Sequence, residues 1–138
     1  VECSPSGAPR IKNFPVEHSS VSHCRGVVAV VASHRECGVD VERKDRNFER
    51  VASRYVSDQE WALCRERGCE RGVFLAAVWC AKECMYKAAQ CESVSLKDDI
   101  TVEDIDLSAG VIVGRVAGGE SIYMRLVDRG DYLIVYSY

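Results

Sequence analysis

The amino-acid sequence predicts an α+β fold, in which one long helix packs on an antiparallel sheet. The helix is predicted at 73–90, because these eighteen residues include no Gly or Pro and repeat apolar side chains at helical spacing. The sheet is predicted near the C-terminus, where three β-branched and aromatic runs are separated by Gly-containing turns. These runs are 111–116, 122–127 and 132–136. With 138 residues, the chain (1–138) has the length of a single domain.

The first part of the chain predicts a lead-in and two strands. Positions 1–19 hold all three prolines, which favours an extended, loop-like segment. The run 27–32 is almost entirely apolar, which favours a central strand. After a short turn comes a second strand, 38–42, and we expect the two to form a hairpin. That pairing would place His23 and Asp40 in one sheet.

A basic segment follows the second strand. In 43–55 four arginines recur at i, i+3, i+7 and i+11, which predicts one basic face of a helix. Such a face is usually only solvated, but beside a reactive site it would also suit an acidic protein partner. The four residues are Arg43, Arg46, Arg50 and Arg54.

A short helix is predicted between the basic segment and the long helix. Ser57 and Glu60 match a capping box, which marks the first turn of a helix, and Gly68 lies where that helix should end. The long helix follows, and 92–99, rich in charge and serine, is predicted to be its exit loop.

Three carboxylates stand out in these elements. The strand 38–42 alternates, so that Asp40 and Glu42 project from one face. On the long helix, Glu83 lies with Trp79 and Lys87 on a ridge at the edge of the apolar stripe. Three converging carboxylates would form an oxygen site for Mg²⁺. The alternative is an exposed strand face plus an ordinary helix ion pair.

Four short elements, in order, resemble those of the 4'-phosphopantetheinyl transferase superfamily. Gly-Val-Asp-Val-Glu at 38–42 and Trp-Cys-Ala-Lys-Glu-Cys-Met-Tyr-Lys at 79–87 resemble the family's signature pair. Ser-Val-Ser-His-Cys at 20–24 and Val-Ser-Leu at 94–96 resemble elements of its surfactin-synthetase-type branch. Together they point to the C-terminal, metal-binding part of that branch.

The resemblance implies a fold and a reaction. The fold would be one 4'-phosphopantetheinyl transferase-like half. The enzyme, a holo-[acyl-carrier-protein] synthase, would move 4'-phosphopantetheine from coenzyme A to a serine hydroxyl of an acyl or peptidyl carrier protein. Its cofactor would be Mg²⁺. A catalytically inactive carrier-protein-binding module of the same fold is the alternative function.

The resemblance also assigns roles to particular residues. Asp40, Glu42 and Glu83 would hold Mg²⁺ against the pyrophosphate of the coenzyme. Glu83 would also be the base for the serine proton, and Lys87 would stabilise charge on the phosphoryl oxygens. The coenzyme phosphates would be contacted by His23 and Lys82.

Two departures from the family pattern are visible. The family has Gly-Lys-Pro where this chain has Gly7-Ala8-Pro9, so that one basic contact is lost, and Arg10 or Lys12 would have to replace it. Members of the branch are pseudo-dimers with the coenzyme between two halves, and here most of the N-terminal half is absent. We therefore expect either self-association or a longer polypeptide.

Composition and the cysteine pattern bear on which other classes of protein remain. A net charge of −3 argues against a nucleic-acid binder, and no apolar run approaches the ~20 residues of a membrane span. The eight cysteines contain no Cys-x-x-Cys, and Cys80 and Cys84 lie on the apolar stripe of the long helix. We expect them to be buried, reduced thiols of a cytoplasmic protein. The rival reading is a thiol-rich zinc or redox protein.

Overall fold

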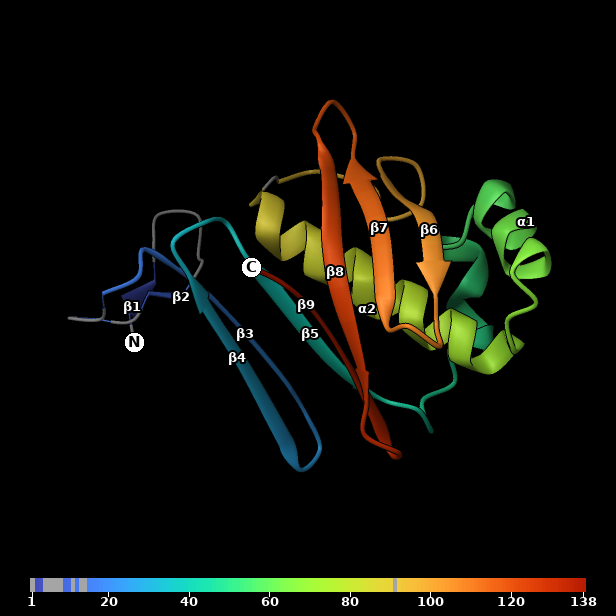
Figure 1. The fold of residues 1–138 in the computed structure, drawn as a ribbon, viewed down its shortest axis with the longest axis horizontal. Helices are drawn as coiled ribbons and strands as arrows, with labels where there is room; N and C mark the ends of the chain where they lie inside the picture. Colours follow the sequence, from blue (N-terminus) through green and yellow to red (C-terminus); the bar gives the residue numbers. More distant parts are fainter. Residues whose placement is uncertain (1, 4–8, 11, 13–14, 91) are drawn as a thin grey trace.

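The computed structural model describes residues 2–3, 9–10, 12, 15–90 and 92–138. Within them, a five-stranded sheet lies in front of one long helix, α2, and a separate two-stranded hairpin extends from the edge of the sheet (Figure 1). None of the described helices is long and apolar enough to cross a membrane. The elements are β1 (Glu2–Cys3), β2 (Pro9–Arg10), β3 (His18–Cys24), β4 (Val27–Ser33), β5 (Gly38–Arg43), the 3-10 helix η1 (Glu49–Arg54), α1 (Asp58–Glu66), α2 (Arg71–Ala89), β6 (Ile100–Asp106), β7 (Val111–Val116), β8 (Ser121–Asp128) and β9 (Tyr132–Ser137).

The large sheet is antiparallel throughout, with strand order β5-β9-β8-β7-β6. The predicted meander is confirmed, since β7, β8 and β9 follow one another as neighbours. Strand β6 was not predicted. Its buried residues Ile100, Val102 and Ile105 do not keep a strict alternation, because the register shifts between Val102 and Asp104.

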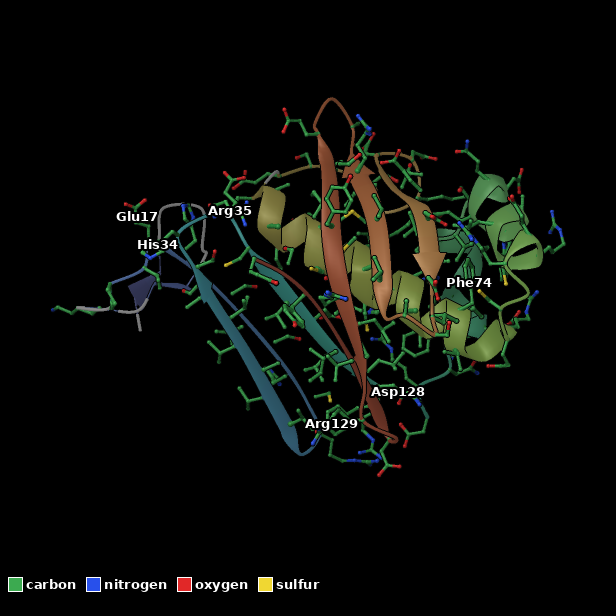
Figure 2. All side chains as sticks on the ribbon, viewed as in Figure 1. Glu17, His34, Arg35, Phe74, Asp128 and Arg129 are labelled. Carbon is green, nitrogen blue, oxygen red and sulfur yellow. The ribbon has the colours of Figure 1, made fainter. Side chains whose placement is uncertain are left out.

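Helix α2 is confirmed and is buried on more than one face. The predicted stripe is buried from Ala76 to Ala88, including the free thiols Cys80 and Cys84, while Val73 at its start is half-buried. Phe74, on another face of α2 (Figure 2), is also fully buried. Its ring centroid lies 6.1 Å from that of Trp61 on α1. The sheet covers one side of α2, and η1 and α1 cover another. The helix is therefore buried over a wider surface than the single apolar stripe predicted. Cys91, which the stripe would include, lies outside the described residues.

The predicted pairing of β4 with β5 is wrong. Strand β5 pairs with β9, and β4 pairs only with β3. Strand β4 is also not central: Val28 and Val30 are 70% and 57% exposed. His23 and Asp40 therefore belong to different sheets. An apolar run cannot by itself distinguish a central strand from one arm of a two-stranded ribbon, because both can be rich in valine.

Serine hydroxyls join the β3–β4 hairpin to the edge of β5. Ser20 Oγ accepts a hydrogen bond from the backbone N–H of Val39 at 3.2 Å, and Ser22 Oγ accepts one from Val41 at 3.1 Å. These side chains occupy the outer N–H groups of β5 that a neighbouring strand would otherwise pair with. The hairpin is thus held beside β5 without extending the large sheet.

The predicted basic helix face is also wrong. Arg43 ends β5, Arg46 lies in the following turn, and only Arg50 and Arg54 belong to η1. A helical spacing rule does not hold across a strand end, a turn and a 3-10 helix. The next prediction is confirmed: Ser57 is the N-cap of α1 and forms a capping box with Glu60.

Candidate functional site

The site forms where β5 passes close to α2. A Cβ atom at Gly38 would lie 2.1 Å from the backbone oxygen of Cys84, so only glycine allows this approach. The approach brings Lys87 of α2 beside Asp40 of β5. Lys87 Nζ donates to the backbone oxygen of Val39 at 2.9 Å and to Asp40 Oδ1 at 3.2 Å.

Asp40 is buried, with 4% of its surface exposed. Its Oδ1 accepts hydrogen bonds from Ser22 Oγ at 3.0 Å and from Lys87. Its Oδ2 is buried and accepts no hydrogen bond among the described residues, although the buried thiol of Cys80 lies near this carboxylate. Burial raises the pKa of Asp40 to about 6; Lys87 lowers it and Glu42 raises it. A buried carboxylate oxygen without a partner is a costly feature that calls for a ligand or a proton.

Glu42 projects from the same face of β5 as Asp40, as the alternation predicted. Its Oε1 accepts two hydrogen bonds, from Arg46 Nη1 at 2.9 Å and from Trp79 Nε1 at 3.0 Å. The Arg46 guanidinium also lies 4.7 Å from the ring centroid of Trp79 and 5.4 Å from that of Phe48. The guanidinium of Arg46, a cation of the chain itself, therefore binds this carboxylate.

Glu83 lies on α2 between Trp79 and Lys87, half-buried. Burial raises its pKa; Lys87 and Arg46 lower it, while Glu42 raises it. The effect of Glu42 on the pKa of Glu83 indicates that the two carboxylates lie near each other. No hydrogen bond to the Glu83 carboxylate is formed within the described part of the chain, so Glu83 is the least engaged of the three acids.

The donor chemistry suits a divalent cation, but the three acids are not gathered around one point. No three side chains of the metal-binding types are close enough to hold an ion, as far as the described residues show. Carboxylate oxygens are the ligands that Mg²⁺ prefers, and the unpartnered Oδ2 of Asp40 is one such oxygen. Two cations of the chain, Lys87 and Arg46, contact Asp40 and Glu42 in this state.

Lys82 lies in the core, away from this site. Its Nζ forms an ion pair with Glu60 Oε1 at 2.8 Å, and both side chains are fully buried. The same nitrogen donates to the backbone oxygens of Tyr55 and Leu96, at 2.6 Å each. Burial lowers the pKa of Lys82, and Glu60 partly offsets this. All three ammonium hydrogens are used inside the chain, so the expected contact with coenzyme phosphates conflicts with this structure.

Glu60 accepts further hydrogen bonds in addition to its ion pair with Lys82. Its Oε1 also accepts the backbone N–H of Ser57 at 2.9 Å, and its Oε2 accepts that of Val102 at 2.7 Å. The pair thus joins the start of α1, the middle of α2 and strand β6. Because Lys82 directly precedes Glu83, this buried network helps to set where Glu83 stands.

His23 is exposed on β3 and is not gathered with the acids. The adjacent Ser22 turns toward β5 and binds Asp40, so alternation along the strand directs His23 away. The substituted family lysine cannot be followed further, because Gly7 and Ala8 lie outside the described residues.

Three contacts of the site were missed from the sequence. Ser22 and Trp79 lie within the motifs described above, but those motifs do not predict hydrogen bonds with Asp40 and Glu42. The sequence predicts Arg46 only as part of the basic face. The one available signal was the i, i+4 spacing of Glu42 and Arg46, which has no fixed meaning across a strand end.

Comparisons with known proteins bear on the family and the fold of the chain. The family model described as 4'-phosphopantetheinyl transferase superfamily matches residues 36–136, well over half of the chain. The crystal structure of Thermotoga maritima holo-[acyl-carrier-protein] synthase is similar in fold, with a TM-score of 0.50 and 17% sequence identity. The match covers 73% of this chain and 60% of that one. No curated protein sequence matches the chain.

Proposed function

Because the chain belongs to the 4'-phosphopantetheinyl transferase superfamily, we propose that it transfers 4'-phosphopantetheine from coenzyme A to a carrier-protein serine. The serine oxygen attacks the β-phosphorus, the bond from that phosphorus to the bridging oxygen breaks, and 3',5'-adenosine diphosphate leaves. The observation that carries the proposal is that Lys87 of α2 binds Asp40 of β5, whose Oδ2 is buried without a hydrogen-bond donor among the described residues. Glu42 and Glu83 lie near this pair.

Glu83 is the proposed base for the serine proton. Its raised pKa brings the carboxylate closer to the operating range of a base at neutral pH, and its oxygens are not engaged by described donors. Lys87 stands four residues later on α2. Two of its three ammonium hydrogens bind Val39 and Asp40, which leaves one to stabilise charge on a phosphoryl oxygen.

Mg²⁺ is the proposed cofactor, held by Asp40, Glu42 and Glu83. When bound, it would supply positive charge to the coenzyme pyrophosphate. Support comes from the unpartnered Asp40 Oδ2 and from the two acids on one face of β5. The placement in the surfactin-synthetase-type branch rests on the Ser20–Cys24 element, whose Ser22 hydroxyl meets Asp40.

The substitution Glu83→Gln tests the base. We expect carrier loading, followed as the mass gained by the carrier protein, to fall by about 10²-fold or more, with circular dichroism unchanged. Glu66→Gln, on the exposed surface of α1, is the matched control and should load normally. Loading at the normal rate by the Glu83 variant would remove Glu83 from the mechanism.

A carrier-binding module without transferase activity is the second candidate. It is favoured by the chain's own cations on Asp40 and Glu42, and by exposed Arg50 and Arg54, which form no ion pair with described residues. Such a module would bind an acidic carrier protein but not coenzyme A. Isothermal titration with coenzyme A and Mg²⁺, and separately with the carrier, distinguishes the two.

Coenzyme binding is proposed to need a second lobe or a second copy of the chain. The outer face of the β3–β4 hairpin exposes Val21, Val28 and Val30, which is the kind of apolar surface that a neighbouring subunit or lobe would cover. Light scattering paired with the loading assay tests this. A monomer with full activity would contradict it.

A further inference from the structure

We infer that Arg46 acts as a latch on Glu42: its guanidinium occupies the carboxylate that a divalent cation needs, and the cation must displace it. This inference rests on the proposed function, because it takes Asp40, Glu42 and Glu83 as the metal-binding acids. It assigns to Arg46 a positioning role, exerted through Glu42, that is separate from docking a protein substrate.

The latch is built from side chains alone. Arg46 Nη1 and Trp79 Nε1 both donate to one oxygen of Glu42, at 2.9 and 3.0 Å. The guanidinium is also placed over the rings of Trp79 and Phe48. Each contact is weak by itself, but an ion pair combined with two cation–π contacts is enough to oppose a competing cation about 5- to 30-fold.

Arg46 can leave more easily than the second cation at the site. Lys87 is bound to the backbone oxygen of Val39 as well as to Asp40, and its helix is packed in the core. Arg46 stands in the turn after β5, and 44% of its side chain is exposed. Release of Arg46 would lose its two ring contacts at a half-exposed position, whereas release of the less exposed Lys87 would break a second hydrogen bond.

The latch also accounts for the ungathered acids. Glu42 is turned to Arg46 and Trp79, while the Oδ2 of Asp40 is buried without a partner. Oδ2 of Asp40 thus accepts no hydrogen bond from the described residues, while Oε1 of the neighbouring Glu42 is already bound by Arg46 and Trp79. Freeing Glu42 from Arg46 would leave that acid available to the same ion as Asp40.

Titration of MgCl₂ into the full chain, followed by calorimetry, tests the latch without any enzymatic reaction. Arg46→Gln should tighten Mg²⁺ binding about 5- to 30-fold relative to the unsubstituted chain. Arg43→Gln is the matched control: it removes the same charge nearby, but Arg43 pairs with Asp45 and not with Glu42. Its Mg²⁺ affinity should change by less than about threefold, as expected for a charge that only contributes through screened electrostatics.

Indole fluorescence gives a second readout. In a Trp61→Phe background, the remaining indole, Trp79, should respond to Mg²⁺ as Arg46 leaves its ring. The response should be absent in Arg46→Gln, which has no guanidinium to release. Arg46→Lys, which retains the charge but not the planar stacking group, should bind Mg²⁺ with intermediate affinity, and it carries the test if Arg46→Gln does not fold.

Failure of the latch and failure of the proposed metal site give different results. Equal tightening in the Arg46 and Arg43 variants would mean that only net charge matters, and would overturn the latch while leaving the metal site in place. Unchanged Mg²⁺ affinity in the Arg46 variants would also overturn the latch and leave the metal site in place. If no variant binds Mg²⁺ and carrier loading proceeds in EDTA, then the proposed metal site itself is wrong and the latch falls with it.

Discussion

Replacing Asp40 by Asn is expected to stabilise the fold at neutral pH. Burial raises the pKa of Asp40 from 3.8 to about 6. At about 1.4 kcal/mol per pH unit of pKa difference, the ionised carboxylate costs the folded chain roughly 3 kcal/mol above pH 6. Below pH 3.8 both states are protonated and the cost disappears. The stabilising contribution of protonated Asp40 is therefore lost as the pH rises through 6.

The assay is urea unfolding at pH 4 and pH 7.5, with EDTA present so that no divalent ion contributes. Asparagine resembles the protonated acid and retains an oxygen for Ser22 and Lys87. The variant should gain about 2–3 kcal/mol at pH 7.5 and little at pH 4. Asp131→Asn, at an exposed turn, is the control and should change stability by less than about 0.5 kcal/mol. Equal destabilisation of the Asp40 variant at both pH values would refute the reasoning, because the Ser22 and Lys87 contacts would then outweigh burial.

Three further predictions concern the framework of the site. Lys82→Met should lower the free energy of unfolding by about 3–5 kcal/mol in urea titrations, because it leaves Glu60 buried without a counter-charge, and adding Glu60→Leu should restore part of the loss. Gly38→Ala should cost about 3 kcal/mol or more by the same measurement, since its Cβ would overlap the backbone oxygen of Cys84; a loss below about 1 kcal/mol would show that β5 and α2 can separate cheaply. Cys80 and Cys84 should alkylate slowly in the native state and rapidly in urea, as measured by mass spectrometry, because burial raises the pKa of each thiol; fast native labelling would contradict their packing.

Local pattern was sufficient for the elements whose contacts are close in the sequence. The alternation at 38–42 correctly placed Asp40 and Glu42 on one face, since side-chain direction in a strand depends only on residue parity. The Ser57 and Glu60 capping box predicted the start of α1, because both partners lie within one helical turn. The motif at 79–87 likewise placed Trp79, Glu83 and Lys87 at the border of the core, and all three are half-buried.

The tertiary structure decided what depends on distant partners. Strand β5 pairs with β9, about a hundred residues away, and no local periodicity specifies which strand a given edge will meet. Lys82 follows the helical pattern of its neighbours, yet its role is set by Glu60 on another helix. Alternation placed Glu42 on the same strand face as Asp40, but the sequence did not show that Arg46 and Trp79 would bind it. The charge of a residue and the face on which it lies can be predicted from the local sequence. The partner that binds that charge is determined only by the tertiary structure.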